Sequence, residues 1–182
     1  MRKTPKDTKA ADAETDPNQS GPGARSSFLA SHHDLVIKAV IAVLVMAVYF
    51  QVHGFDFINL DDNLYVYENP AVLGGLNWLS INWAFAALYA ANWHPLTWMS
   101  YQFDASVFGT GPGIFHSVNA FFHLINSILG FVVFRRITGR EWESAAVAIL
   151  FAVHPAHVES VAWIAERKDV LSTMFWLLTM WS

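Results

Sequence analysis

Residues 35–52 read LVIKAVIAVLVMAVYFQV, and only Lys38 and Gln51 interrupt this apolar run. About 20 apolar residues in a helix cross the hydrocarbon core of a bilayer, so the run predicts a membrane-spanning helix over about residues 35–53. The long side chain of Lys38 can extend from the edge of such a span toward the headgroups. This stretch therefore predicts a membrane protein.

Three further apolar segments follow. The first of them, residues 114–134, reads IFHSVNAFFHLINSILGFVVF and is long enough for a second span. The next covers about residues 144–156 and should break at His154-Pro155, because proline suits the first turn of a new helix. The last, residues 170–182, is too short to cross, so we expect the chain to be the N-terminal fragment of a larger membrane protein.

Composition agrees with this prediction. Of 182 residues, 54% are hydrophobic and only 14% are charged, against roughly 45–50% and about 25% in average soluble domains. There is no cysteine, which excludes disulfides and thiolate chemistry, and the net charge of −4 gives no case for a nucleic-acid partner. Residues 1–33 are polar and predict a disordered tail, followed by a partial membrane domain over residues 34–182. We therefore expect an all-α, polytopic membrane helical bundle.

Positive charges predict the orientation of the chain, because Lys and Arg favour cytoplasmic loops. The cations are Arg2, Lys3, Lys6, Lys9, Arg25 and Lys38 before the first span and Arg135, Arg136 and Arg140 after the second. No Lys or Arg lies between Lys38 and Arg135. The N-terminus should thus be cytoplasmic, with outer loops at about residues 54–113 and 157–169.

The first of these loops is itself apolar. Residues 76–98 read LNWLSINWAFAALYAANWHPLTW and contain four tryptophans, which predicts one or two interfacial helices along the membrane surface. The alternative is that Trp78, Trp83, Trp93 and Trp98 only anchor the loop at headgroup level.

Two groups of polar residues could carry chemistry near this loop. Asp61 and Asp62 are adjacent, so their side chains should point in different directions and suit two roles. One carboxylate could act as general base for a hydroxyl acceptor, while the other orients it or holds a divalent cation. The alternative is a solvated Asp-Asn turn.

The second group is a stripe on the second span, His116, Asn119, His123 and Asn126, whose spacing puts all four on one helical face. Polar side chains at membrane depth face protein or a watery cavity. Interhelical hydrogen bonding and a ligand cavity both explain this stripe.

Residues 154–169, HPAHVESVAWIAERKD, contain the only Lys and Arg on the predicted outer side. Arg167 and Lys168 could hold a lipid phosphate, or they could form a helix-end cluster with Glu166 and Asp169. The spacing of His154, His157 and Glu159 would also allow a metal, as a weaker alternative.

The chain resembles a known family in four motifs that occur in order. They are FINLDDNLYVYENPAV, ANWHPLTWMSYQFD, FHSVNAFFHLIN and LFAVHPAHVESVAWIAERKDVLSTMFWLLT, within about residues 55–182. They resemble the membrane portion of bacterial tetratricopeptide-repeat membrane proteins, which are similar to the transmembrane-and-tetratricopeptide-repeat O-mannosyltransferases. The resemblance implies GT-C-type spans and transfer of a sugar from a polyprenyl-phosphate carrier to a protein hydroxyl on the outer face. It implies an acidic pair near the catalytic centre at Asp61-Asp62, and an R-K-D segment at Arg167, Lys168 and Asp169.

We therefore expect a multi-pass protein of the bacterial inner membrane whose partners are a lipid-linked sugar donor, an acceptor protein and membrane lipids. The fragment alone should be inactive. Asp61 or Asp62 is the expected base, and the expected substrate-binding residues are Arg167, Lys168, Asp169, His116, Asn119, His123, His157 and Glu159. A cofactor is not implied, apart from the divalent cation considered above. The alternatives are a non-catalytic membrane anchor or scaffold for a repeat domain and, less favoured, a transporter.

Overall fold

The computed structural model describes the backbone of residues 22–182 and the side chains from His32 onward. Residues 1–21, the greater part of the predicted disordered tail, lie outside the described residues. The first helix, α1 (Pro22–Tyr49), begins well before the apolar run and so includes residues 22–33 of that predicted tail. Proline is favoured at the first helical position, which accounts for a start at Pro22. Residues 36–182 form one compact unit, which is described below.

Three more long helices follow α1 in this unit, namely α5 (Pro112–Thr138), α6 (Glu141–Val153) and α8 (Arg167–Trp181). Residues His32–Gly54 and α5 are long and apolar enough to cross a membrane. A third span would be α6 together with η3 (Pro155–His157) and α7 (Val158–Ala162), a pair bent by 50°. The predicted all-α polytopic bundle is thus confirmed, and no named strand occurs in residues 22–182.

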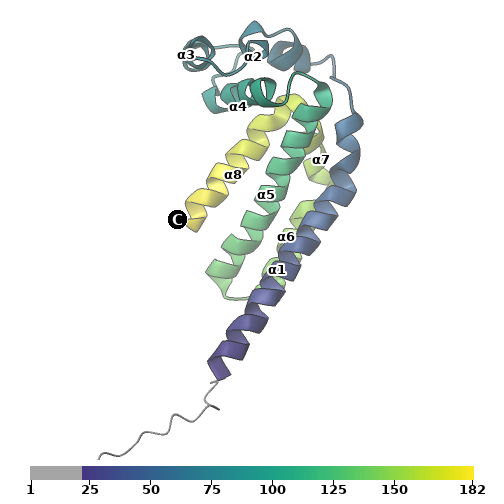
Figure 1. The fold of residues 1–182 in the computed structure, drawn as a ribbon, viewed down its shortest axis with the longest axis vertical. Helices are drawn as coiled ribbons and strands as arrows, with labels where there is room; N and C mark the ends of the chain where they lie inside the picture. The colour runs from purple at the N-terminus through teal and green to yellow at the C-terminus, as the bar shows by residue number, and fades with distance from the viewer. Residues whose placement is uncertain (1–21) are drawn as a thin grey trace, which may run out of the picture. The chain divides into compact units, whose positions relative to one another are not determined.

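Helix α5 lies at the centre of the bundle, where α6 and α8 pack along it (Figure 1). Its Phe131 belongs to a buried core with Ile41 and Val45 of α1 and with Ala148 and Ala152 of α6. Small residues on α6 allow close approach of the helices, as is common between membrane helices.

Prolines and glycines set the helix boundaries. Helix α6 ends at Val153, directly before the His154-Pro155 dipeptide at which the sequence predicts a break. Pro112 occupies the first turn of α5, and Gly139 ends that helix in the left-handed conformation, at φ 69°. Gly113 lies so close to the backbone carbonyl of His53 that a Cβ would collide with it. This glycine therefore allows the turn that follows α1, which contains His53, to dock on α5.

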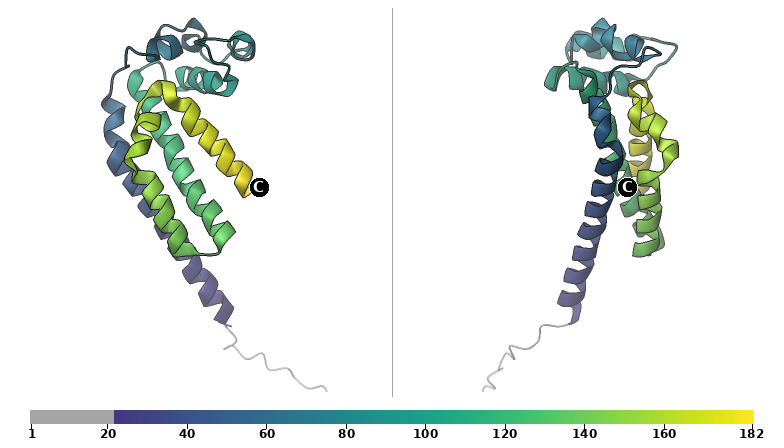
Figure 2. Two further views of the ribbon diagram at one scale, coloured as in Figure 1. Left: turned by 180° about the vertical axis from the view of Figure 1, so that it is seen from behind. Right: turned by 90° about the vertical axis from the view of Figure 1, so that its right-hand side faces the viewer.

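Residues 50–111, here called the connecting segment, join α1 to α5 and fold over one end of the bundle (Figures 1 and 2). We call this end the covered end. The segment contains the helices η1 (Phe50–Gly54), η2 (Asn63–Tyr67), α2 (Pro70–Leu73), α3 (Trp78–Ala86) and α4 (Pro95–Val107).

The connecting segment packs around an aromatic core that it shares with the bundle. Trp98 and Tyr101 are fully buried in it, together with Tyr65 and Phe115. Trp78 and Trp93, in contrast, are 74% and 61% exposed. Of the four tryptophans in residues 76–98, Trp78 and Trp93 are therefore the most exposed. The idea that Trp98 anchors the loop at headgroup level is wrong, because its ring is enclosed by other aromatic rings.

Candidate functional site

Asp62 ties the connecting segment to the covered end of the bundle. Its carboxylate is fully buried and accepts hydrogen bonds from the amides of Ile58, at 2.9 Å, and Ala165, at 3.1 Å. Ala165 belongs to the short helix η4 (Ile164–Glu166), which precedes α8. Burial raises the pKa of Asp62, while the two backbone amides and the nearby His116 oppose that rise. Asp62 therefore acts as a clamp between two distant parts of the chain.

Asp61 has a different environment. It is half-buried, and within residues 32–182 its carboxylate has no hydrogen-bond partner. It lies near the hydroxyl of Tyr65, whose pKa is raised by burial and by the carboxylates of Asp61 and Glu166, while Lys168 lowers it. Asn92 donates a hydrogen bond of 2.9 Å to the same hydroxyl. Adjacent aspartates thus have separate surroundings, and Asp61 is the one whose oxygens remain available.

Lys168 is an accessible cation close to Tyr65. Its side chain is 33% exposed, and its Nζ lies 2.7 Å from Oε1 of Glu166 and 5.9 Å from the ring centre of Tyr65. The side chain also lines a cavity of about 700 Å³ together with His94 and Asp169. Burial, together with the charge of Lys168, lowers the pKa of His94 to about 4, so this imidazole is neutral at pH 7. A negatively charged ligand in the cavity would therefore meet Lys168.

Arg167 points into the protein instead. It is fully buried and donates hydrogen bonds to Asn119 Oδ1, at 2.7 Å, and to the carbonyl of Phe115, at 2.8 Å, and it forms an ion pair with Asp104. Its guanidinium lies over the ring of Tyr101, 4.5 Å from the centroid. Burial raises the pKa of Asp104, and Arg167 opposes that rise. The buried pair joins α4, α5 and α8, so a lipid phosphate would reach Lys168 rather than Arg167.

Sequence reasoning did not single out Asp104 or Tyr101 as site residues. Tyr101 donates a hydrogen bond of 2.7 Å to the carbonyl of Ile164, next to the Asp62 clamp. The one available signal was an acidic residue within an apolar helix, because such a side chain requires a partner when buried.

The polar stripe on α5 forms hydrogen bonds between helices. All four side chains are buried, and each contacts a backbone carbonyl of another element. The pairs are His116 with Asp56 (3.3 Å), Asn119 with Trp163 (2.9 Å), His123 with Ala152 (3.1 Å) and Asn126 with Val170 (2.8 Å). Ala152 lies beside the break after α6 and Trp163 beside the break before η4, where helical carbonyls lose their usual partners. The stripe thus holds broken helices against α5, and two of its members also line a small cavity considered below.

The remaining predicted residues do not gather into a metal centre. His157 packs on Phe151, with ring centroids 4.3 Å apart, and Asp169 Oδ2 accepts a hydrogen bond of 2.9 Å from Ser160. Glu159 is exposed. In the part of the chain that the structure describes, no group of three or more His, Cys, Asp or Glu could hold a metal ion. The described residues therefore show no clustered ligand set for a metal.

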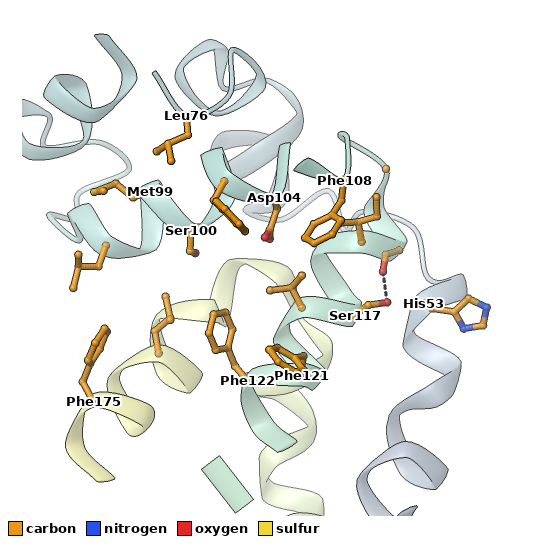
Figure 3. A pocket seen from close by; sticks show the side chains of 17 residues that line it. His53, Leu76, Met99, Ser100, Asp104, Phe108, Ser117, Phe121, Phe122 and Phe175 are labelled. Carbon is orange, nitrogen blue, oxygen red and sulfur yellow. Dashed lines mark hydrogen bonds between the residues drawn. The ribbon is translucent and has the colours of Figure 1, made fainter. Parts of the chain in front are cut away.

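A cavity of about 1180 Å³ lies between α4, α5 and α8 (Figure 3). Its walls are mainly apolar and include Phe103, Phe121 and Phe175. Leu96, Leu171 and Phe175 line both this cavity and the one at Lys168. An apolar cavity thus adjoins a site that carries a cation.

These features define a helical membrane protein whose connecting segment and bundle together enclose a charged site and an apolar cavity. Its relatives are protein O-mannosyl-transferases. The chain is 30% identical to Protein O-mannosyl-transferase Tmtc1 of Drosophila melanogaster over 155 residues, which is 81% of this chain and 18% of that protein. It is 26% identical to TMTC2 of Mus musculus over 153 residues, 80% of the chain and 18% of the relative.

A third relative, TMTC1 of Mus musculus, is 34% identical over 92 residues, or 50% of this chain and 10% of that protein. The family relationship predicted from the four motifs is thus confirmed. The chain spans less than a fifth of the length of these relatives. No protein-family model matches it, and no solved structure matches it.

Proposed function

We propose that this chain contributes the donor and base sites of a membrane O-glycosyltransferase, which moves a sugar from a polyprenyl-phosphate carrier to a protein hydroxyl. The single observation that supports this most strongly is the Asp62 clamp, because it brings Asp61 to the same end of the bundle as Lys168. The relatives are named as O-mannosyl-transferases, which implies a sugar donor and a protein acceptor for them.

Asp61 is the proposed general base. Its carboxylate would take the proton of the acceptor hydroxyl as that oxygen bonds to the anomeric carbon of the sugar. The bond between the anomeric carbon and the phosphate oxygen breaks in the same step, and the carrier leaves as polyprenyl phosphate. Lys168 would stabilise the negative charge that develops on this phosphate. Arg167 would fix the start of α8, and hence Lys168, without touching the substrate.

The apolar cavity of about 1180 Å³ is the proposed place for part of the polyprenyl chain. Its walls offer aromatic and aliphatic side chains to a hydrocarbon, and it adjoins the cavity of Lys168. One lipid could then place its phosphate at Lys168 and its hydrocarbon chain among the phenylalanine side chains.

We also propose the location of the reaction from charge. The N-terminus would be cytoplasmic and the connecting segment would lie on the outer face of a bacterial inner membrane, because that segment lacks Lys and Arg. Accessibility labelling of single cysteines introduced within residues 1–182 tests this location, because these residues include no cysteine of their own.

The test is transfer of labelled mannose from polyprenyl-phosphate mannose to a serine- and threonine-rich peptide, with the full-length protein in proteoliposomes. Removal of a general base should slow transfer by roughly 10²–10⁴-fold, so Asp61→Asn should reduce it to that extent. Asp56→Asn is the matched control, because Asp56 is an exposed aspartate of the same segment. Transfer by Asp61→Asn at the rate of the control would overturn the assignment and favour a scaffold.

A further inference from the structure

A small polar cavity, of about 260 Å³, lies between α5, α7, α8 and the end of α6. We propose that it binds the ring of one neutral monosaccharide through its hydroxyl groups. This inference rests on the proposed function, since the ring would be the sugar of the lipid-linked donor. The polar residues that line the cavity are His123, Asn126, His157, Ser160, Asp169, Ser172 and Thr173.

Two of the lining residues, Asn126 and His123, have hydrogen-bond acceptors without a donor. Asn126 is 1% exposed, and its Nδ2 donates to Val170, whereas its Oδ1 is buried without a hydrogen-bond partner. His123 contacts the carbonyl of Ala152 through Nε2, which must then carry the proton, so Nδ1 is left as an acceptor. A buried acceptor without a partner costs about 1–3 kcal/mol, which a ligand hydroxyl would relieve.

The charge of the lining argues for a neutral ligand rather than an ion. Asp169 is the only formally charged side chain among the lining residues, and one of its oxygens is already engaged by Ser160. No Lys or Arg lines this cavity, which disfavours a phosphate or carboxylate there. A metal lacks ligands, as no cluster of three occurs among the described residues. Hydroxyl groups both donate and accept, so a polyol matches this lining.

One wall is apolar and aromatic. The ring of Phe151 lines the cavity and lies 4.3 Å from the ring of His157 and 5.3 Å from that of His123. The C–H face of a sugar ring has an apolar surface to bury against such a wall, while its hydroxyl groups reach the polar side. The volume equals that of about nine waters at ~30 Å³ each, which leaves space for one ring rather than a chain of sugars.

The position of the cavity matches the chemistry proposed for Lys168. Asp169 and Ser172 line both this cavity and the cavity of about 700 Å³ that contains Lys168. A donor lipid could therefore place its phosphate at Lys168 and its sugar on the other side of Asp169. The small cavity would then select the sugar, and the large apolar cavity would hold the lipid.

Thr173→Leu tests this inference, since the larger side chain fills the cavity at a position where Thr173 has no hydrogen bond within residues 32–182. Thr179→Leu is the matched control, on an exposed face of the same helix. Saturation-transfer NMR of the full-length protein in nanodiscs, with methyl α-D-mannopyranoside as probe, should show binding to the wild type and to Thr179→Leu. Thr173→Leu should weaken that binding by about tenfold or more, because a ring displaced by the leucine side chain loses its hydrogen bonds to the other lining residues.

Two further measurements separate the inference from the proposed function. Thr173→Leu should raise the KM for polyprenyl-phosphate mannose, yet leave inhibition by sugar-free polyprenyl phosphate unchanged, whereas Lys168→Gln should weaken that inhibition. Equal mannoside binding by Thr173→Leu and wild type, or none by either, would overturn the sugar subsite even if Asp61-dependent transfer is intact. Mannoside binding lost only in Thr173→Leu, with no transfer by the wild type, would support the subsite and refute the transferase.

Discussion

The ion pair between Arg167 and Asp104 allows a sharp test of what holds the connecting segment to the bundle. Replacement of Arg167 by Met removes the guanidinium and retains an unbranched apolar chain. The buried carboxylate of Asp104 loses its cation, and Asn119 Oδ1 and the Phe115 carbonyl lose their donor. Breaking a buried pair from one side costs about 3–5 kcal/mol, so we expect a loss of that size in the free energy of unfolding.

The double variant Arg167→Met with Asp104→Leu separates the pair from its surroundings. It removes the unpaired carboxylate, so it should be more stable than Arg167→Met alone by about 2 kcal/mol or more, because apolar replacement of both partners is often close to neutral. Unfolding in mixed micelles, followed by tryptophan fluorescence, measures these differences through the rings around Trp98.

The control for this experiment is Arg140→Met. Arg140 pairs with Glu143 at 3.5 Å, but both side chains are largely exposed, at 71% and 63%. Exposed pairs contribute about 0–1 kcal/mol, so Arg140→Met should change stability little. Additive effects of Arg167→Met and Asp104→Leu, with no recovery in the double variant, would refute the reasoning that one buried pair joins α4 to α8.

Two other predictions concern packing and pH. Gly113→Ala should destabilise the protein by about 1–3 kcal/mol in the same assay, because the added Cβ meets the carbonyl of His53. Gly130→Ala is the control, since a Cβ there meets open space, and it should be neutral or stabilising by up to about 1 kcal/mol. Equal effects of the two substitutions would exclude the clash. His94 has a pKa of about 4 in the folded protein, below the ordinary 6.5, so unfolded chains bind its proton more readily and stability should fall as the pH drops from about 6.5 to 4. His94→Gln should lose stability less steeply over that pH range, and an unchanged slope would contradict the assignment.

Much of the bundle was predictable because membrane helices follow from local properties of the sequence. The length of the apolar runs located α1 and α5, and Pro155 marked the break after α6. The spacing of His116, Asn119, His123 and Asn126 correctly placed these residues on one face, since helical periodicity does not depend on distant partners. Their hydrogen bonds were not predictable, because each acceptor is a backbone carbonyl that any residue could supply.

The site depended on contacts that are distant in sequence. Arg167 and Asp104 are 63 positions apart, so their pairing cannot be read from the local sequence. The residue types also do not reveal which of the two neighbouring cations, Arg167 or Lys168, is buried. Arg167 and Lys168 are neighbours with the same charge, yet the turn of the helix directs one inward and the other toward His94. Similarly, the aspartate pair suggested two roles, but only the contact of Asp62 with Ala165 shows that Asp61 is the available member.

The clamp formed by Asp62 also limits how this region can move. One oxygen of Asp62 accepts from the amide of Ala165, which is 103 positions away in the sequence. The other oxygen accepts from the amide of Ile58, which is four positions away. If the connecting segment opens, η4 and the first turn of α8 must therefore move with it, or the buried carboxylate of Asp62 loses its hydrogen bond to Ala165. Opening of the connecting segment and displacement of Lys168 would then be mechanically linked events.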